Sequence, residues 1–323
     1  MEDSSLCYAI GIDIGGTTTK LGLVNSAGAV VKFHQIPTDS QGVCLSEFLD
    51  RIVEIARSLY RNSPGRVVGV GLSILGPLNT ERTGPFLSAN APILTQVNFR
   101  ELIVSTLDCP VVVNNDLTAH ALAEYYFGNG RGVRRFMSLA LGTGVGTGVI
   151  IDGQPLRLWG GTAGDCGRMI LDPYSEVRCG CGVAGSAEAL CGTANIERLA
   201  RERYGYFLSA HDIISKARDR SDDIAVGIVR EIGKYVGQLI ASLYAIFFPD
   251  KVVLTGGTAT AGSELLQACC TRFDELSGAF MQQVHQTAPD QFEILKIEIG
   301  KMKESTGVVG SVVELFQEDK RSF

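Results

Sequence analysis

Two turns rich in glycine and threonine constrain the fold of this chain more than any other feature of its sequence. The first lies in GIDIGGTTTK, residues 11–20, and the second is LGTGVGTG, residues 141–148. Apolar residues typical of buried strands flank both turns, so each turn is expected to join a strand to its return strand. The repeat of this pattern in the two halves predicts a chain with two α/β lobes.

Strand and helix patterns complete each half. In the first half we expect three strands before residue 37, a helix over residues 46–62 with Ser46 as its cap, and a strand PVVVNND that leads into a helix near Thr118. In the second half we expect a long helix over residues 222–248, then the strand KVVLTGG and another helix. No low-complexity linker separates the halves, so the boundary near Thr118 follows from the repeat alone.

The composition indicates a globular protein and argues against several classes. With 323 residues and 45% hydrophobic content, the chain can bury two cores. The longest apolar run, residues 235–248, is too short to cross a bilayer, and the acidic N-terminus does not resemble a secretory signal. Nine scattered cysteines do not suggest a disulfide framework, so we expect a cytoplasmic protein. A net charge of -6 without a basic cluster argues against nucleic-acid binding.

Both turns have the chemistry of a phosphate site. Glycine lets backbone N–H groups approach an anion, threonine hydroxyls add donors, and Asp13 at the end of the first strand can hold a magnesium ion directly or through water. Either turn alone would be read as an ordinary hairpin, because glycine is common in turns. Two such turns facing each other, one with a carboxylate, favour a site that grips a triphosphate between the lobes.

Other nucleotide and catalytic motifs are absent from the sequence. Thr17 stands where a Walker A motif requires lysine, and Thr147 occupies the place of the third glycine of a dinucleotide-binding motif. The four histidines lie far apart in the sequence. His120 lies at the start of a predicted helix beside a possible site, where packing or capping is the more common role for a histidine.

The strand PVVVNND ends in polar residues that suit acid–base chemistry. Asp116 lies at the carboxyl end of a buried strand beside Asn115, where it could orient a hydroxyl and accept its proton. The alternative is helix capping, since Asn and Asp often begin helices. Together with the two turns and Asp13, the catalytic reading is the better prediction for Asp116.

GIDIGGTTTK, NND, LGTGVGTG and VVLTGGTATAG occur in an order and spacing that resembles the ROK family of bacterial sugar kinases. The resemblance extends from Ile10 to about Leu315. It implies an α/β fold of the two-lobed actin-like ATPase (ribonuclease H-like) type, in which each lobe is a mixed sheet flanked by helices and ATP and sugar bind in the interlobe cleft. Residues 1–118 and a C-terminal helix over about 305–323 would form the small lobe, and residues 119–304 the large lobe.

The resemblance also implies roles for individual residues. The nucleotide-binding positions would be Asp13, Gly15, Gly16, Thr17, Thr18 and Lys20 in the first motif, Gly142, Thr143, Gly144 and Gly146 in the second, and Gly256 and Gly257 in the adenosine motif. The sugar-binding positions would be Gly76, Asn90, Asn115, Asp116, Asp165, Arg168 and Glu188. Asp116 would be the catalytic base, so Asp116→Asn should retain sugar binding and lose most turnover.

The chain departs from the family in its zinc segment. ROK kinases usually carry E-x-G-H followed by C-x-C-G-x-x-G-C-x-E, in which the histidine and three cysteines bind zinc. Here Arg168 replaces the histidine and Ser186 the third cysteine, so that only Cys179 and Cys181 remain. Structural zinc prefers four N or S ligands, and neither guanidinium nor hydroxyl is a substitute. Zinc is therefore not expected, unless the two remaining cysteines and Cys166 and Cys191 form a rearranged site.

The expected activity is ATP-dependent, magnesium-assisted phosphorylation of the primary hydroxyl of a hexose, with a glucose-like sugar as first choice. N-acetylglucosamine, N-acetylmannosamine, an amino sugar and fructose remain open, because Asp165 is shorter than the usual glutamate and Arg168 could pair with Asp165 or Glu188 or contact a different sugar. A weakly catalytic sugar sensor of the same family is an alternative. A repressor is less expected, since the first motif begins at residue 11 and leaves no room for a winged-helix domain. ROK kinases are commonly homodimers or homotetramers.

Overall fold

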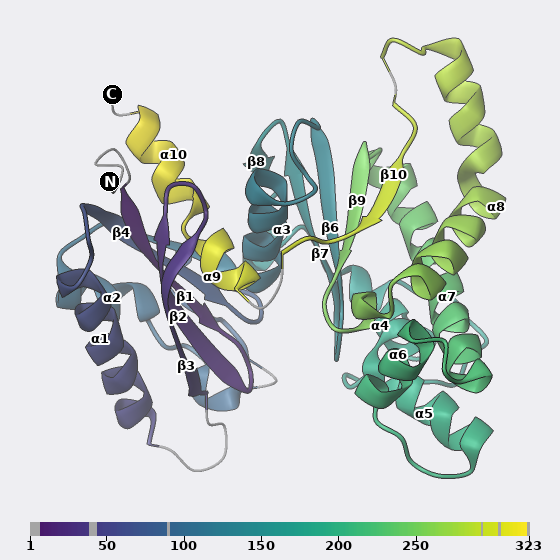
Figure 1. Ribbon diagram of the computed structural model, residues 1–323, viewed down its shortest axis with the longest axis horizontal. Helices are drawn as coiled ribbons and strands as arrows, with labels where there is room; N and C mark the ends of the chain where they lie inside the picture. Colours follow the sequence, from purple (N-terminus) through teal and green to yellow (C-terminus); the bar gives the residue numbers. More distant parts are fainter. Residues whose placement is uncertain (1–6, 39–43, 89–90, 292, 303–304, 322–323) are drawn as a thin grey trace.

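The computed structural model describes the chain except residues 1–6, 39–43, 89–90, 292, 303–304 and 322–323. The described residues form two five-stranded sheets, one in each half (Figure 1). The strands of the first sheet, in spatial order, are β3 (Val30–Pro37), β2 (Thr18–Asn25), β1 (Tyr8–Ile14), β4 (Val67–Ile74) and β5 (Val111–Asn115). Those of the second are β8 (Gln154–Pro155), β7 (Val145–Ile151), β6 (Arg135–Leu141), β9 (Lys251–Thr255) and β10 (Lys296–Ile299).

The two sheets share one topology. In the first, β1 pairs antiparallel with β2 and parallel with β4. The outer pair β2–β3 is also antiparallel, and the outer pair β4–β5 is also parallel. In the second, β6 pairs antiparallel with β7 and parallel with β9. The outer pair β7–β8 is antiparallel and the outer pair β9–β10 is parallel. The repeated strand–turn–strand pattern of the sequence therefore corresponds to a repeated mixed sheet.

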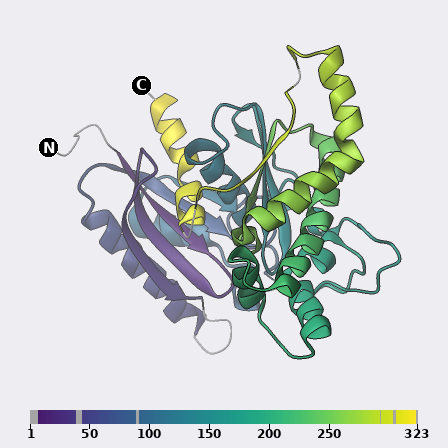
Figure 2. The same ribbon diagram turned by 45° about the vertical axis from the view of Figure 1, so that its right-hand side comes forward.

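The helices form three layers around the sheets (Figures 1 and 2). Helices α1 (Leu45–Arg61) and α2 (Phe99–Leu107) cover the outer face of the first sheet. Between the sheets lie α3 (Asp116–Phe127), α9 (Thr306–Ser311) and α10 (Val313–Arg321). The outer face of the second sheet carries α4 (Ala187–Cys191), α5 (Thr193–Tyr204), α6 (Ala210–Arg218), α7 (Asp223–Phe247) and α8 (Ser263–Thr287). Short 3-10 helices are η1 (Pro92–Leu94), η2 (Trp159–Gly161), η3 (Cys166–Arg168) and η4 (Thr258–Ala261).

Glycines allow the central helices to approach each other and the first sheet closely. A Cβ atom at Gly11 of β1 would lie 2.1 Å from the carbonyl oxygen of Val308 in α9. A Cβ at Gly310 would lie 1.8 Å from the carbonyl oxygen of Ala119 in α3. Because real Cβ atoms do not approach backbone oxygens this closely, larger residues would push the layers apart. The two halves thus meet through a backbone-to-backbone contact of α3 and α9.

Element boundaries differ from expectation in two places. Ser46 is not a cap: α1 begins at Leu45, Cys44 precedes it, and no side chain caps the helix. The helix expected near Thr118 begins at Asp116, because the side chain of Asn115 caps it. The lobe boundary at residue 118 thus falls within α3, which packs on β6 and β7 of the second sheet; the lobe limits remain a prediction.

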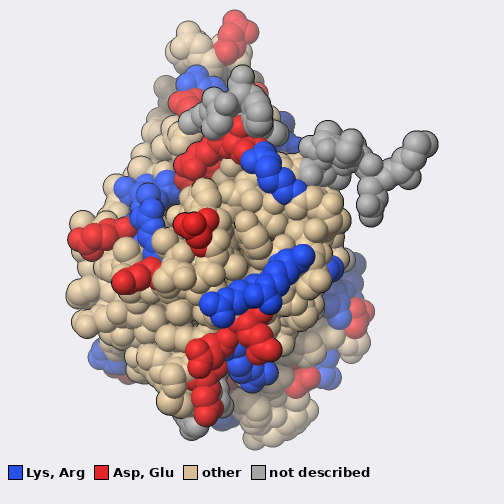
Figure 3. All heavy atoms as spheres, turned by 90° about the vertical axis from the view of Figure 1, so that its left-hand side faces the viewer, with Lys and Arg blue, Asp and Glu red and all other residues tan. Residues whose placement is uncertain are grey.

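The long helix expected over residues 222–248 is α7, and it is capped by Asp222, whose side chain accepts from Ile224 N and Ala225 N. Twelve of its residues are buried against the second sheet and neighbouring helices. Across the described ranges, no helix is long and apolar enough to span a membrane. On the face of the first half shown in Figure 3, acidic and basic side chains are interspersed over a mostly neutral surface.

Candidate active site

Asp13, the predicted metal-binding carboxylate, is held in place by two elements distant in sequence. It lies near the end of β1, opposite Lys20 of β2 and Ser73 of β4. The Ser73 hydroxyl donates to Asp13 Oδ1 at 2.7 Å. Gly307 of α9 lies against the same carboxylate, since a Cβ there would be 2.2 Å from Asp13 Cγ. The carboxylate is therefore oriented at the mouth of the first turn.

The first turn exposes backbone and hydroxyl donors next to Asp13. It is closed by a hydrogen bond of 3.1 Å from Gly15 N–H to the Thr18 carbonyl, and Thr17 at its tip is exposed. Gly16 and Lys20 are partly buried beside it. This is the arrangement expected of a loop that cradles phosphate oxygens with its amides and hydroxyls.

The second turn lies at the corresponding place in the second sheet and touches Glu188. Gly142 N–H donates to the Gly144 carbonyl at 3.0 Å, and Thr143 and Gly144 are exposed. A Cβ at Gly144 would lie 2.8 Å from Glu188 Oε2. Gly146, in contrast, is buried in β7, where its lack of a side chain makes room for Leu117 of α3. The structure gives Gly146 a packing role, and its contact with nucleotide stays a prediction.

The predicted adenosine segment lies beside the second turn. Gly256 and Gly257 follow β9, which runs parallel to β6, so their backbone leaves the sheet at the same edge as the turn that follows Leu141. Gly256 has a φ of 86°, and a Cβ there would lie 2.3 Å from the Leu141 carbonyl oxygen. Both observations require glycine at this position. Gly257 is exposed with open space around it.

Asn115 connects the predicted base to the predicted sugar loop. Its side-chain oxygen accepts from Leu117 N at 3.0 Å, which caps α3. Its Nδ2 donates to the carbonyl oxygen of Gly76 at 2.7 Å. Gly76 has a φ of 82° and lies against the Leu87 carbonyl. The side chain of Asn115 therefore both caps α3 and holds the predicted sugar loop at Gly76. Asn90, the other predicted residue of this wall, lies outside the described residues.

Asp116 has the electrostatics of a general base. Burial, opposed by His120 and the Leu117 N–H and aided by the nearby Asp13 carboxylate, raises the pKa of its carboxyl to about 6. Asp13 and Asp116 therefore lie within electrostatic reach, although one comes from β1 and the other begins α3. A base works best when its pKa lies near the working pH. His120 lies one turn further along α3 and acts electrostatically on the Asp116 carboxyl.

Three predicted sugar-binding side chains form one cluster. Arg168 donates from Nη1 to Glu188 Oε1 at 2.9 Å and from Nε to Asp165 Oδ2 at 3.2 Å. Glu188 Oε2 accepts from the backbone of Val145 at 3.4 Å. Burial opposes the charge of Arg168, but the carboxylates of Glu188 and Asp165 raise its pKa, so it stays protonated. Glu188 is thus held between the second turn and Arg168.

The remnant cysteines join this cluster. Arg168 Nη1 lies 3.1 Å from Cys179 Sγ, and the sulfur atoms of Cys179 and Cys181 are 2.9 Å apart. Burial alone would raise the pKa of Cys179, but hydrogen bonds from Cys181, the backbone and Ser186 together lower the pKa to about 7. The guanidinium therefore faces a polarised sulfur.

Cys166 and Cys191 do not complete a zinc site with these sulfurs. Both are buried in the large hydrophobic core of the second half. Burial raises the pKa of Cys166 to about 12 and also raises the pKa of Cys191. Among the residues that the structure describes, no group of three or more His, Cys, Asp or Glu could hold a metal ion. The rearranged four-cysteine alternative is therefore not formed, and the donor set does not fit structural zinc.

The model of the ROK family matches residues 9–316 of the chain. The chain belongs to the ROK family. A glucokinase from Halalkalibacterium halodurans is 30% identical over 284 residues, 83% of this chain and 85% of that protein. An N-acetyl-D-glucosamine kinase from Aliivibrio fischeri is 30% identical over 76% of the chain and 83% of its own length. The transcriptional repressor Mlc of Escherichia coli is 26% identical, over 76% of the chain and 62% of the repressor.

Solved structures agree with this ROK assignment. A ROK hexokinase from Thermus thermophilus superposes with a TM-score of 0.80 at 27% identity, over 97% of this chain and 99% of that one. A ROK glucokinase from Streptomyces griseus, solved with glucose and AMPPNP, has a TM-score of 0.77 at 24% identity, over 96% and 99%. The predicted family and the predicted actin-like ATPase fold are confirmed.

Several residues of this ROK site were not predicted from the sequence. Ser73 and Gly307, which orient Asp13, are separated from it by long stretches of chain, and only the pairing of β1 with β4 and the packing of α9 bring them together. Arg157, a link between the two halves and not a residue of the predicted site, was missed as well. It donates to Asn114 Oδ1 at 2.7 Å and to Glu314 Oε2 at 2.6 Å, and so links the chain after β8 to β5 and α10. No local motif marks these residues.

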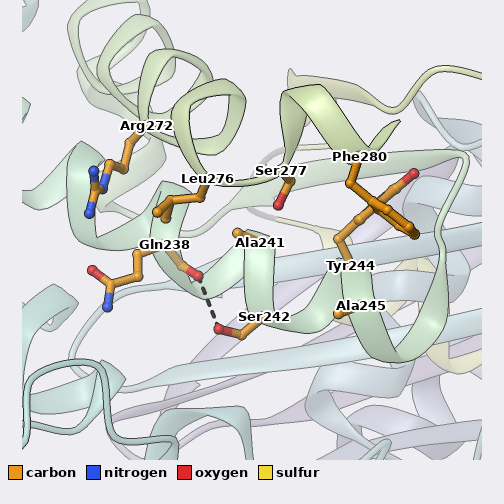
Figure 4. A pocket seen from close by; sticks show the side chains of 9 residues that line it. All are labelled: Gln238, Ala241, Ser242, Tyr244, Ala245, Arg272, Leu276, Ser277 and Phe280. Carbon is orange, nitrogen blue, oxygen red and sulfur yellow. Dashed lines mark hydrogen bonds between the residues drawn. The ribbon is translucent and has the colours of Figure 1, made fainter. Parts of the chain in front are cut away.

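A cavity of about 470 Å³ lies on the ROK chain away from these residues (Figure 4). It runs along α7 and α8, where Leu276 and Phe280 of α8 lie over Ala241 and Ala245 of α7. None of the predicted site residues lines it, and it contains neither a carboxylate nor a glycine turn. The candidate active site is therefore the group of turns and carboxylates around Asp13, Asp116 and Glu188.

Proposed function

We propose that this ROK protein is an ATP-dependent kinase that phosphorylates the primary hydroxyl of a hexose. The observation that carries the proposal is Asp116, a carboxyl with a pKa raised to about 6 by burial and placed within electrostatic reach of Asp13. The related glucokinases and the glucokinase solved with AMPPNP support sugar phosphotransfer with ATP as donor. The fold alone would not decide this, because repressors share the family.

The proposed mechanism uses each group for one task. Asp116 accepts the proton of the primary hydroxyl as its oxygen bonds to the γ-phosphorus of ATP, while the bond from that phosphorus to the β–γ bridging oxygen breaks and ADP leaves. The amides and hydroxyls of the two turns, around Thr17 and Thr143, align the phosphates and stabilise the charge that develops on them. Asn115 fixes the Gly76 loop and thereby the sugar wall. Closure of the two halves would exclude water and limit hydrolysis of ATP.

Magnesium is the proposed companion of ATP, and Asp13 is the residue that would hold it, directly or through water. The fit rests on the donor chemistry: a carboxylate, fixed through Ser73, lies at the mouth of a phosphate-binding turn. When bound, the ion would neutralise charge on the β- and γ-phosphates. Structural zinc is not part of the proposal, because the cysteine segment does not supply its ligands.

A glucose-like hexose is the first-choice substrate. Asn115, Asp116 and Glu188 are all retained, and glucokinases are among the relatives. N-acetylhexosamines are the main alternatives, since relatives also include an N-acetyl-D-glucosamine kinase and an N-acetylgalactosamine kinase. Arg168, at 38% side-chain exposure, offers donors that a histidine would not, and could shift the preference among these sugars.

The decisive test is an ADP-release assay with ATP and magnesium over a panel of glucose, mannose, fructose, glucosamine and the N-acetylhexosamines. Turnover with at least one hexose is the expected result. A second candidate, a sugar sensor with little catalysis, is favoured by the altered segment around Arg168. It predicts thermal stabilisation by a sugar without ADP release, whereas a kinase shows both.

We also propose a cytoplasmic location and a homodimeric or homotetrameric assembly. All nine cysteines are free thiols in the structure, as expected in a reducing compartment. Light scattering on the purified protein measures the assembly, and a monomeric mass would contradict it.

A further inference from the structure

We propose that Arg168 takes the place of a structural metal ion in this chain: its guanidinium ties the loop around Cys179 to the preceding segment and thereby positions Glu188 for the sugar. The inference rests on the proposed sugar kinase function and concerns how one wall of the sugar site is built. Arg168 acts through Glu188, so it is a positioning residue and not a catalytic one.

The contacts of Arg168 converge from three directions. Nε binds Asp165 Oδ2 at 3.2 Å, on the segment before η3. Nη1 binds Cys179 Sγ at 3.1 Å, on the cysteine loop, and Glu188 Oε1 at 2.9 Å, in the first turn of α4. One side chain thus links three points of the chain spanning residues 165–188. A tetrahedral ion would link the same region through its ligands.

The positions that would surround such an ion are still gathered. The Cys179 and Cys181 sulfurs lie 2.9 Å apart. The Ser186 hydroxyl, which donates to the Val183 carbonyl at 3.4 Å, is near enough to lower the pKa of Cys179. Arg168 Nη1 contacts the Cys179 sulfur as well, at 3.1 Å. Arg168, Cys179, Cys181 and Ser186 therefore lie near one another, and two of these four side chains are not metal ligands.

A guanidinium suits this role for a physical reason. It is planar, permanently charged and carries five N–H donors in fixed directions, so it can hold a carboxylate and a sulfur at once. Charge-assisted hydrogen bonds of this kind contribute more than neutral ones. With the Val145 N–H on its other oxygen at 3.4 Å, Glu188 is fixed on both sides.

The loss of Arg168 should release Glu188 and leave the nucleotide turns intact. The first experiment measures kcat and the KM values for sugar and for ATP in Arg168→Ala and Arg168→Lys, with the best sugar of the panel. Removal of a charge-assisted hydrogen bond should raise the sugar KM about tenfold or more, with the ATP KM within about twofold. Arg168→Lys should retain more sugar affinity than Arg168→Ala, because lysine keeps the positive charge but lacks the planar set of N–H donors of the guanidinium.

Arg134→Ala is the matched control. Arg134 forms a surface pair with Asp152 at side-chain exposures of 81% and 59%, far from this cluster in the sequence, and its loss should leave both KM values unchanged. A folded Arg168→Ala variant with an unchanged sugar KM would overturn the positioning role. A fall in kcat with both KM values unchanged would overturn it as well.

The second experiment restores the metal. Arg168→His combined with Ser186→Cys places a histidine and three cysteines at the four clustered positions. The double variant should purify with zinc in a one-to-one ratio and lose thermal stability on chelation, whereas the wild type should contain no zinc and be insensitive to chelators. Ser186→Cys alone is the control for the lost cap of α4, where Ser186 accepts from Ala189 N at 3.2 Å.

The outcomes separate this inference from the proposed function. One-to-one zinc in the wild type, or none in the double variant, would overturn the replacement of a metal by Arg168. If no sugar of the panel is phosphorylated by the wild type, the proposed kinase function fails. The zinc content of the two proteins then still tests the replacement, since that measurement needs no activity.

Discussion

The side-chain amide of Asn115 donates to the carbonyl oxygen of Gly76 at 2.7 Å, and the same side chain caps α3 through Leu117 N. The two bonds fix the side chain from opposite ends, because one uses its Nδ2 and the other its oxygen. A single amide therefore holds both the loop after β4 and the start of the helix that carries Asp116.

Asn115→Asp tests this arrangement. The carboxylate still accepts from Leu117 N, but it cannot donate to Gly76 and repels its carbonyl oxygen. We expect the sugar KM to rise about tenfold or more, since an unmet buried partner costs about 1–3 kcal/mol. Asn98→Asp is the control, because Asn98 caps α2 at the surface through Glu101 N. Equal KM values for the two variants would contradict the role of the bond.

Asp116→Asn should remove the base and keep the pocket. The amide is nearly the same size, so sugar binding by calorimetry should be retained, while kcat falls by about two to four orders of magnitude. Asp152→Asn, on the exposed surface, serves as the control. Near-normal turnover would remove Asp116 from its role as base.

The pH profile follows from the raised pKa of Asp116. The base must be ionised, and burial raises its pKa to about 6. We therefore expect kcat/KM for the sugar to be constant above about pH 7 and to fall about tenfold per unit below about pH 6. A profile that stays flat from about pH 5 to 8 would be inconsistent with Asp116 as the titrating group.

The same shift predicts a pH-dependent stability. Because the folded-state pKa of Asp116 lies above its ordinary value of 3.8, its ionisation destabilises the fold, and this cost develops between about pH 4 and 6 and persists above. Asp116→Asn should therefore raise Tm at about pH 8 and lose this advantage below about pH 4. Thermal unfolding of both proteins at the two pH values measures this difference in Tm. A Tm of the variant below that of the wild type at about pH 8 would contradict the predicted destabilisation by ionised Asp116.

Gly307→Ala should displace Asp13. The added Cβ would lie 2.2 Å from Asp13 Cγ, so either the carboxylate or α9 must move. We expect kcat/KM for ATP to fall about tenfold or more, by loss of a well-placed carboxylate. Gly278→Ala in α8 is the control: its Cβ would meet only Asp274 at 3.7 Å, and it should stabilise the helix by up to about 1 kcal/mol. Wild-type ATP kinetics in folded Gly307→Ala would contradict the expectation.

The fold could be predicted from the sequence because its signals are local. The turns at Gly15 and Gly142 each join two paired strands. The long stretch of apolar residues at helical spacing that ends near Phe248 corresponds to α7. The cap of α1 was mispredicted because Ser46 resembles an N-cap although the helix begins one residue earlier. Local patterns identify elements better than their first residues.

The site could be predicted only in part. Asp13, Asp116 and Glu188 lie in motifs, but the contacts that orient them do not. The bond from Ser73 to Asp13 depends on strand register, and the bond from Val145 N–H to Glu188 joins β7 to α4. The sequence left open whether Arg168 pairs with Asp165 or Glu188; in the structure it pairs with both. Such pairings follow from tertiary packing.

The shared strand order of the two sheets has an electrostatic consequence. Asp13 lies two residues before Gly15, and Ala140 lies two residues before Gly142, so the duplicated unit carries an acid on one side and a methyl group on the other. Two facing carboxylates would repel the triphosphate and each other. In the proposed kinase the cation would therefore be held by the strand itself only on the side of β1. On the side of β6 the carboxylate next to the turn is Glu188, which comes from α4 and is already bound by Arg168.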